Sequence, residues 1–257
     1  MSRILVTGST DGIGRESARQ LLDAGHQVVG HARSAARADQ LRAVLPHLSD
    51  VVVGDLSSLT ETRDLAAQAT TSGPFDAVIH NAGVGGGATG RTLTGDGLER
   101  IFHVNTVAPY LLTSLMPRPG RLVYLTSGLE AQGRARLDDL QYGERAWDGM
   151  QAYSDSKLYD VVLAFAVARL WPDVLVTTVD PGWIKTKLGG PDAWDEVHDG
   201  AATQVWLATS DDDAARVTGC YVKRFELQDA NPQASDLKIQ DGLLVRLAEI
   251  TGVRLPR

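Results

Sequence analysis

The stretch that decides the fold is Ile4-Leu5-Val6-Thr7-Gly8-Ser9-Thr10-Asp11-Gly12-Ile13-Gly14, close to the start of the chain. Its apolar beginning predicts a strand over residues 3–7, and its glycines predict a tight turn. A helical pattern follows as far as Ala24-Gly25, and residues 27–31 are again typical of a strand. Strand, glycine-rich turn, helix and strand make a βαβ unit, which we expect to be parallel and right-handed.

Such a turn predicts a nucleotide-binding site. Glycines let the backbone come close to a pyrophosphate, and the free N–H groups and dipole of the following helix favour its negative charge. A glycine-rich turn is a stronger signal when it follows a strand and opens a helix, as it does here. A turn with a purely structural role is the alternative.

The end of the second strand predicts the type of nucleotide. An acidic residue there would bind a free ribose 2′-hydroxyl, whereas an arginine suits a 2′-phosphate. The strand ends in Gly30-His31-Ala32-Arg33-Ser34, which holds an arginine and no carboxylate. The sequence therefore predicts NADP(H) over NAD(H), although Asp11 in the glycine turn favours the opposite choice.

Strands and helices continue to alternate along the whole chain. Five more apolar runs predict strands, at 51–53, 75–79, 121–125, 174–179 and 219–222. The intervening patterns predict helices, at 38–45, 58–70, 98–115, 151–170, 200–209 and 236–250. We therefore expect an α/β fold with a doubly wound parallel sheet of the Rossmann type, with about seven strands and helices on both faces. Without a linker or repeat, residues 1–257 are expected to form a single domain.

Composition excludes several classes of function. The net charge of the 257 residues is −7, so a nucleic-acid partner is not expected. Cys220 is the single cysteine, which excludes an intrachain disulfide and a cysteine metal cluster, and no histidine spacing predicts a metal site. No apolar run approaches the roughly 20 residues of a membrane span. Since no signal peptide precedes the first strand, we expect a cytoplasmic protein.

A second motif, Gln151-Ala152-Tyr153-Ser154-Asp155-Ser156-Lys157, opens the longest predicted helix. Residues four apart share a helix face, so Tyr153 and Lys157 should point into the same small volume. An ammonium beside a phenol stabilises the phenolate, which makes a usable proton donor and acceptor near neutral pH. The alternative is a partly exposed tyrosine beside a lysine that reaches for solvent.

Taken together, the motifs resemble the short-chain dehydrogenase/reductase family over nearly the whole chain. In order, they are Thr7-Gly8-x-x-x-Gly12-x-Gly14, Asp55, Asn81-Ala82-Gly83, Asn105, Ser127, Tyr153-x-x-x-Lys157 and Pro181-Gly182. The resemblance implies an oxidoreductase that transfers a hydride between a nicotinamide and a carbonyl or alcohol.

The resemblance also implies a cofactor site. The pyrophosphate would lie on Gly8, Gly12 and Gly14, the adenine beside Asp55, and the adenosine ribose near Asn81. Thr186 would touch the cofactor near the carboxamide. Further cofactor contacts are expected from Thr10, Asp11, Ile13, Arg33, Leu56, Ala82, Gly83, Tyr153, Lys157, Pro181, Gly182, Trp183 and Ile184.

Four residues would form the catalytic group that the resemblance implies. Ser127 would bond the substrate oxygen, and Tyr153 would give it a proton or remove one. Lys157 would bind the nicotinamide ribose and favour the phenolate, and Asn105 would hold a water that relays protons. Each residue also has a structural alternative: Ser127 as a turn residue, for example, or Asn105 bonded to a backbone carbonyl.

Two segments are expected to shape the substrate site. Ser127 and Tyr153 are 153 − 127 = 26 positions apart, and the long insert between them, about 128–150, resembles the retinol-dehydrogenase and protochlorophyllide-reductase-like branch. A second loop, about 183–199, carries Trp183, Leu188 and Trp194 and is expected to act as a lid. Both features favour an apolar carbonyl or alcohol, although the aromatic residues could serve packing alone.

Two other functions remain open at this point. A sugar-nucleotide epimerase or dehydratase shares Y-x-x-x-K, and a nucleotide-sensing regulatory protein could be built on the same fold. The retained Ser127, Tyr153 and Lys157 favour the oxidoreductase. A homodimer through the long helices 98–115 and 151–170 is possible, since both carry apolar faces.

Overall fold

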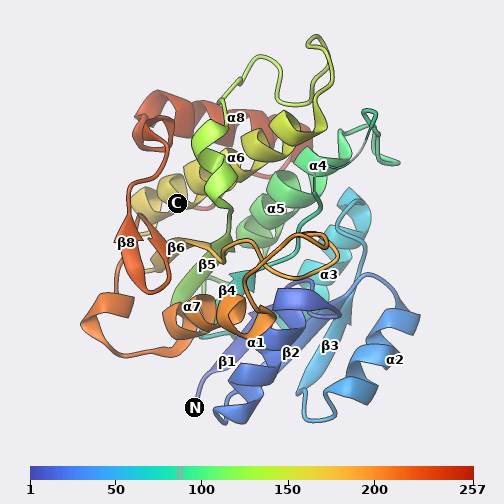
Figure 1. The fold of residues 1–257 in the computed structure, drawn as a ribbon, viewed down its shortest axis with the longest axis vertical. Coiled ribbons are helices and arrows are strands. Elements are labelled where there is room, and N and C mark those ends of the chain that lie inside the picture. The colour runs from blue at the N-terminus through green and yellow to red at the C-terminus, as the bar shows by residue number, and fades with distance from the viewer. Residues whose placement is uncertain (86, 88) are drawn as a thin grey trace.

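The computed structural model describes residues 1–85, 87 and 89–257. Its centre is one sheet with the strand order β3-β2-β1-β4-β5-β6-β7-β8 (Figure 1). The strands are β1 (Arg3–Val6), β2 (Gln27–Ala32), β3 (Asp50–Val53), β4 (Ala77–His80), β5 (Arg121–Leu125), β6 (Leu175–Asp180), β7 (Cys220–Lys223) and β8 (Glu226–Gln228). All neighbouring pairs from β3 to β7 are parallel. The predicted doubly wound parallel sheet of the Rossmann type is therefore confirmed.

The last strand, β8, was not predicted. It pairs antiparallel with β7 through a two-residue turn, Arg224-Phe225, in which both residues have positive φ angles. That is the geometry of a tight hairpin, which usually contains Asn or Gly. The turn contains neither Asn nor Gly, and all three residues of β8 are exposed. The sequence therefore gives no turn signal and no apolar pattern from which this hairpin could be predicted.

Alternating side chains on the strands divide the core into two layers. Ile4 and Val6 of β1 pack on one face of the sheet, whereas Leu5 packs on the other, as the strand period of two requires. The first layer is covered by α1 (Gly12–Asp23), α2 (Ala35–Val44) and α7 (Val197–Thr209). The second is covered by α3 (Leu59–Ser72), α5 (Ala108–Leu115), α6 (Gly149–Leu170) and α8 (Leu237–Thr251).

The long helix expected over 98–115 is divided. It consists of α4 (Arg100–Phe102), a π-helical turn over His103–Val107, and α5. At the end of the π turn, the N–H of Ala108 bonds the carbonyl of His103, five residues back. Pro109 has no N–H to offer the carbonyl of Asn105, which disrupts the regular α-helical ladder at this point. The irregular part of this helix therefore lies just before Pro109, over His103–Val107.

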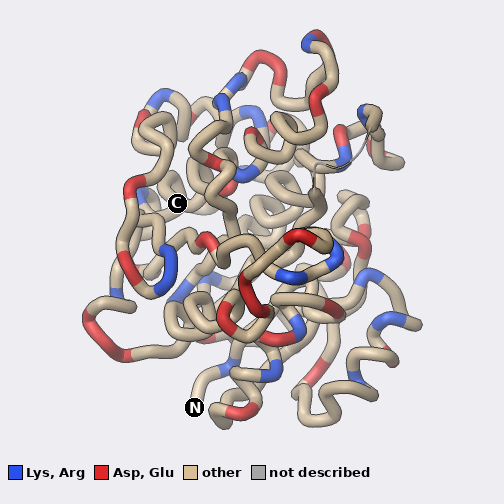
Figure 2. The backbone as a smooth tube through the Cα atoms, in the orientation of Figure 1, with Lys and Arg blue, Asp and Glu red and all other residues tan. Residues whose placement is uncertain are grey.

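The strand order places the functional region. The chain runs outward from β1 through β2 and β3, then returns to place β4 on the other side of β1. Ligands of such sheets bind at the carboxyl ends of the strands, at this reversal. Figure 2 shows acidic and basic residues interspersed around the molecule. Among the described residues, no helix is both long and apolar enough to cross a membrane.

Candidate active site

A cavity of about 520 Å³ lies at the carboxyl ends of the central strands. Its walls come from the glycine turn, the ends of β2 to β6, and the start of α6. Most of the predicted site residues line it: Gly8, Thr10, Asp11, Gly12, Ile13, Gly14, Arg33, Asp55, Leu56, Asn81, Ala82, Gly83, Tyr153, Lys157, Pro181 and Thr186. Segments from almost the whole length of the chain therefore meet in one crevice.

The glycine turn fits closely against the end of β4. Gly8 has a φ of +66°, and a Cβ built there would lie 2.9 Å from Cα of Ala82. A Cβ on Gly14 would lie 2.3 Å from Nδ2 of Asn81, which donates to the carbonyl of Thr7 at 2.9 Å. Only glycine fits at these two positions, so Asn81 and Ala82 hold the turn in place whether or not they touch a ligand.

His31, at the end of β2, fixes the turn from the other side. Its Nδ1 accepts a hydrogen bond from the N–H of Gly8 at 2.9 Å, and its Nε2 lies 2.8 Å from the carbonyl of Gly54. Those partners require the neutral ring with its proton on Nε2. Burial lowers the pKa of His31, which favours the same form. The contact between His31 and the glycine turn was not predicted, although a histidine in an otherwise apolar strand indicates a buried polar partner.

Two arginines stand where β2 gives way to α2. Arg33, predicted from the sequence, is exposed just after β2, and Arg37 lies on the first turn of α2; both line the cavity. Arg37 Nη2 donates to Oγ1 of Thr10 at 3.1 Å and lies 3.8 Å from Oδ2 of Asp11. Arg37 was not predicted to bind the cofactor, although a second arginine four residues after Arg33 can be seen in the sequence.

Asp55 borders the cavity after β3. The N–H and hydroxyl of Ser57 donate to its Oδ1, at 2.9 Å and 2.7 Å. Burial opposes ionisation, but these hydrogen bonds outweigh it and lower the pKa of Asp55. The residue is thus an oriented carboxylate at the cavity wall, held by the turn that follows β3.

Tyr153 and Lys157 do face the same volume. The ammonium of Lys157 lies 5.9 Å from the centre of the Tyr153 ring. Lys157 is buried, and its Nζ donates to the carbonyl of Leu125 and to Oδ2 of Asp160, each at 2.8 Å. Burial acts to lower the pKa of Lys157, but Asp160 and Tyr153 more than offset this and raise it. The lysine therefore remains a cation at neutral pH.

Asn105 and Ser127 border this centre but are not among the residues that line the cavity. The Asn105 side chain joins two elements: Oδ1 accepts from the N–H of Val84 at 2.8 Å, and Nδ2 donates to Oγ of Ser156 at 3.0 Å. Ser127 caps a short 3₁₀ helix over Gly128–Gln132, where its Oγ accepts from the N–H of Leu129 at 3.3 Å. Its hydroxyl proton is not used in that bond and can be donated elsewhere.

The predicted second loop is a short strap, residues 181–196, after β6. A bridge between Ile184 and Asp195 closes it, and α7 begins at Val197, so the loop is shorter than the expected 183–199. Ile184 is buried, and a Cβ on Gly200 would lie 2.5 Å from its Cδ1, so its side chain faces α7 rather than the cavity. Trp183 stacks edge-on against Trp194. Of the strap residues predicted to bind the cofactor, Pro181 and Thr186 line the cavity; Gly182, Trp183 and Ile184 are not among the lining residues.

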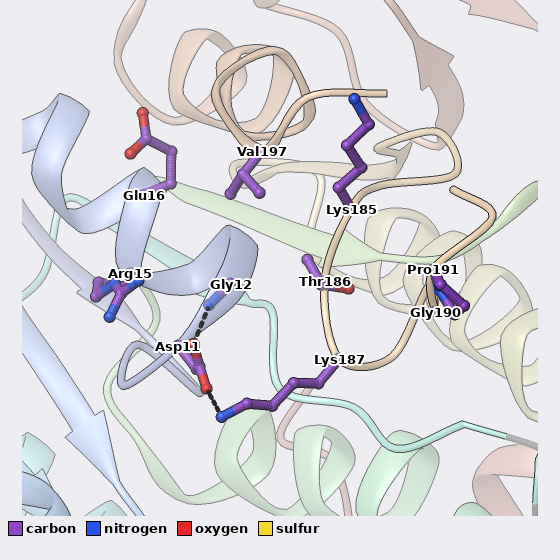
Figure 3. A pocket seen from close by; sticks show the side chains of 10 residues that line it. All are labelled: Asp11, Gly12, Arg15, Glu16, Lys185, Thr186, Lys187, Gly190, Pro191 and Val197. Atoms are coloured by element: carbon purple, nitrogen blue, oxygen red, sulfur yellow. Dashed lines mark hydrogen bonds and ion pairs between the residues drawn. The ribbon is translucent and has the colours of Figure 1, made fainter. Parts of the chain in front are cut away.

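A second cavity, of about 830 Å³, lies beside the first (Figure 3). It shares Asp11, Gly12, Thr186 and Lys187 with the first but contains neither Tyr153 nor Lys157. Lys187 reaches from the strap to Oδ2 of Asp11, 2.5 Å away, and Figure 3 shows this ion pair spanning the space between strap and turn. The predicted catalytic residues Tyr153 and Lys157 line the smaller cavity.

The insert before Tyr153 is attached to α6 by a buried carboxylate. Asp155 accepts hydrogen bonds from the N–H of Arg134 at 2.8 Å, the hydroxyl of Tyr142 at 2.9 Å, and Nη1 of Arg145 at 3.1 Å. Tyr153 itself packs against the small apolar cluster that contains Tyr142.

Within the described residues, no group of three His, Cys, Asp or Glu side chains could hold a metal ion.

Curated relatives match the chain over its full length. It is 41% identical to the short-chain dehydrogenase chyC of Penicillium rubens, over 100% of both chains. It is 31% identical to retinol dehydrogenase 14 of the mouse, over 91% of this chain and 80% of the relative.

Solved structures give the same picture. A crystal structure of a protein from Mycobacterium paratuberculosis, 23% identical, matches with a TM-score of 0.86 over 100% of this chain and 96% of the other. A blue fluorescent protein from a metagenomic library, crystallised with NADPH, is 25% identical with a TM-score of 0.67, over 86% and 95% of the two chains. The family model described as "short chain dehydrogenase" matches residues 2–196. The chain therefore belongs to the short-chain dehydrogenase/reductase family of oxidoreductases.

Proposed function

We propose that this protein is an NADP(H)-dependent oxidoreductase that interconverts a carbonyl and an alcohol on an apolar small molecule, with Tyr153 as the general acid and base. One observation carries the proposal: the phenol of Tyr153 and the ammonium of Lys157 line the same crevice as the glycine turn. A proton-transfer group thus lies beside a surface suited to a dinucleotide.

The residues present fit a nicotinamide dinucleotide. Gly8, Gly12 and Gly14 line the cavity at the start of α1, where free N–H groups and the helix dipole suit a pyrophosphate. Asp55 would meet the adenosine end, Lys157 the nicotinamide ribose, and Thr186 the carboxamide. When bound, the cofactor supplies or accepts the hydride, and the protein contributes position and electrostatics.

The preference for NADP(H) is supported by Arg33 and Arg37. An arginine pair at the end of the second strand suits a 2′-phosphate, since guanidinium groups bind phosphate oxygens with charge-assisted hydrogen bonds. The structural relative crystallised with NADPH favours the same choice. The negative charge of Asp11 would repel a 2′-phosphate, but Lys187 pairs with Asp11 and offsets that charge.

The protein's own residues account for the proton. In reduction, negative charge grows on the carbonyl oxygen, and donors already aimed at it stabilise that charge. The hydroxyl of Tyr153 would give its proton to this oxygen, and Ser127 has a free hydroxyl proton with which to hold it. In oxidation, the Tyr153 phenolate would take the alcohol proton, with the ammonium of Lys157 stabilising the phenolate.

An apolar substrate is supported by the strap. Leu188 lines the cavity, and Trp183 and Trp194 of the same strap leave 42% and 65% of their surfaces exposed. Exposed aromatic side chains at the mouth of a cleft suit an apolar ligand with one polar group. The relative named for retinol, which is an apolar alcohol, favours the same class of substrate.

The test replaces Tyr153 with phenylalanine. We expect Tyr153→Phe to lower kcat by a factor of roughly 10²–10⁴, the usual contribution of a general acid or base, while NADPH still binds. Turnover is measured from NADPH absorbance with a panel of aldehydes and ketones, and binding from NADPH fluorescence. Tyr159→Phe is the matched control, because Tyr159 is buried in the same helix and its hydroxyl makes a single long bond to the carbonyl of Arg134.

Three outcomes would contradict the proposal. Near-normal turnover by Tyr153→Phe would show that Tyr153 is not the general acid and base. Tight NADPH binding without turnover of any carbonyl would favour a nucleotide-sensing protein. Activity on nucleotide sugars with retained NAD would favour the epimerase or dehydratase.

A further inference from the structure

A buried carboxylate, Asp160, lies directly behind the proposed catalytic pair. It stands one helical turn beyond Lys157 in α6, and only 3% of its surface is exposed. Its Oδ2 accepts the hydrogen bond from Lys157 Nζ, whereas its Oδ1 has no hydrogen-bond partner among the described residues. A buried ion pair is weak evidence for stability, so its position beside a proton-transfer group is the informative feature.

Asp160 takes up much of the hydrogen-bonding capacity of Lys157. An ammonium has three donors. One bonds the carbonyl of Leu125 and another bonds Asp160, which leaves a single donor for the crevice that contains Tyr153. The carboxylate and the carbonyl together therefore set where the ammonium can lie.

The other titratable groups near this pair are neutral at physiological pH. Tyr124 of β5 faces Asp160, and burial raises the pKa of Tyr124 well above its usual range. His80 of β4 lies against Tyr124, with ring centres 4.7 Å apart, and burial lowers the pKa of His80 to about 3. Apart from Tyr153, the charges in this part of the described structure are thus those of Lys157 and Asp160.

We propose that Asp160 is a positioning residue that holds Lys157 in the crevice, partly offsets its charge, and so sets the pH range in which Tyr153 exchanges its proton. This inference rests on the proposed function. The ammonium favours the phenolate, and the carboxylate behind it opposes that effect. In the reaction itself, the proton passes between Tyr153 and the substrate oxygen, and Asp160 neither gains nor loses one.

The test compares the pH dependence of kcat/KM in the wild type and in Asp160→Asn, which keeps the shape but removes the charge. We expect the acid limb of alcohol oxidation and the alkaline limb of ketone reduction both to move to lower pH, by roughly one unit. Removing the carboxylate favours the phenolate, which is the active form in oxidation and the inactive form in reduction.

Asp155→Asn is the matched control. Asp155 is also buried in α6, but it bonds the insert rather than Lys157, so its replacement should change the height of the profiles through the packing of Tyr153 and leave both limbs in place. A fall in activity by the same factor at every pH in Asp160→Asn, with unshifted limbs, would overturn the proposal. Lack of turnover by the wild type with every carbonyl would instead refute the proposed function.

A second measurement needs no variant. Burial raises the pKa of Asp160 to about 6, against the opposing effect of Lys157. In wild-type protein labelled with ¹³C at the aspartate carboxyl carbons, we therefore expect one signal to titrate near pH 6. If the Asp160 signal, assigned by its loss in Asp160→Asn, shows a neutral carboxyl group at neutral pH, its charge cannot offset that of Lys157 and the proposal fails.

Discussion

At the level of single residues, the proposed preference for NADP(H) should depend most clearly on Arg37. It stands on the first turn of α2, with its guanidinium against Thr10 and Asp11 of the glycine turn. Thr10 is uncharged and Asp11 lies 3.8 Å away, so neither is a strong partner for the Arg37 guanidinium. A bound 2′-phosphate would be a stronger one. The contribution of Arg37 should therefore depend on the presence of that phosphate.

We expect Arg37→Ala to raise the KM for NADPH by roughly 10–100-fold, the effect of losing hydrogen bonds to a charged group. The KM for NADH should hardly change. Steady-state kinetics with both cofactors check this. Arg42→Ala is the control, since Arg42 lies in the same helix but bonds Asp39 and the carbonyl of Val51 away from the cavity. An equal rise for both cofactors would contradict the assignment.

At the scale of elements, the insert before α6 is a supporting wall rather than a loose loop. Asp155 accepts hydrogen bonds from backbone and side-chain donors of the insert. The guanidinium of Arg145 also lies 3.8 Å from the ring centre of Tyr142. Tyr142 accepts a positive φ of 55° to make these contacts. Because Tyr153 packs on this cluster, the insert should influence the geometry of the proposed acid and base.

Asp155→Ala should lower the free energy of unfolding by about 3 kcal/mol, because it leaves the N–H of Arg134 and the hydroxyl of Tyr142 without an acceptor and removes one of the two carboxylates paired with Arg145. Urea denaturation gives this value, and hydrogen exchange should show faster amide exchange across residues 134–147. Asp138→Ala, an exposed neighbour, should change neither. Unchanged exchange in the insert of Asp155→Ala would mean that other contacts hold it.

At the scale of the whole molecule, the C-terminal segment covers the helices that we expected to form a dimer. In Figure 1, α8 runs alongside α6, and the two helices pack together. Leu243 and Leu247 of α8 are fully buried in that layer. The tail continues across α5, where Tyr110 donates to the carbonyl of Val253 at 2.7 Å. A dimer through α5 and α6 would require this segment to leave.

We therefore expect the wild type to behave as a single chain of 27.6 kDa in size-exclusion chromatography with light scattering. Leu247→Asp should place a charge in the covered layer, expose the α6 face and produce larger or aggregated particles. Val245→Asp, at a position that is 56% exposed in the same helix, should remain a single chain. A stable wild-type particle of twice the mass would contradict the expectation for this face.

The fold class, the parallel sheet and the family could be inferred from the amino-acid sequence, because these depend on local patterns. Short apolar strands, the glycine turn and the four-residue spacing of Tyr153 and Lys157 are all read within a few neighbouring residues. Helix geometry alone places those two side chains on one face. The catalytic and cofactor roles of the individual residues stay predictions.

Which residues distant in the chain come together depends on how the layers pack. Examples are the bond from Lys157 to the carbonyl of Leu125, the attachment of the insert to Asp155 and the packing of α8 over α6. The same holds for the turning of Ile184 away from the cavity and for the exposed strand β8. Such contacts join segments far apart in the chain, so no local pattern of apolar residues or spacing records them.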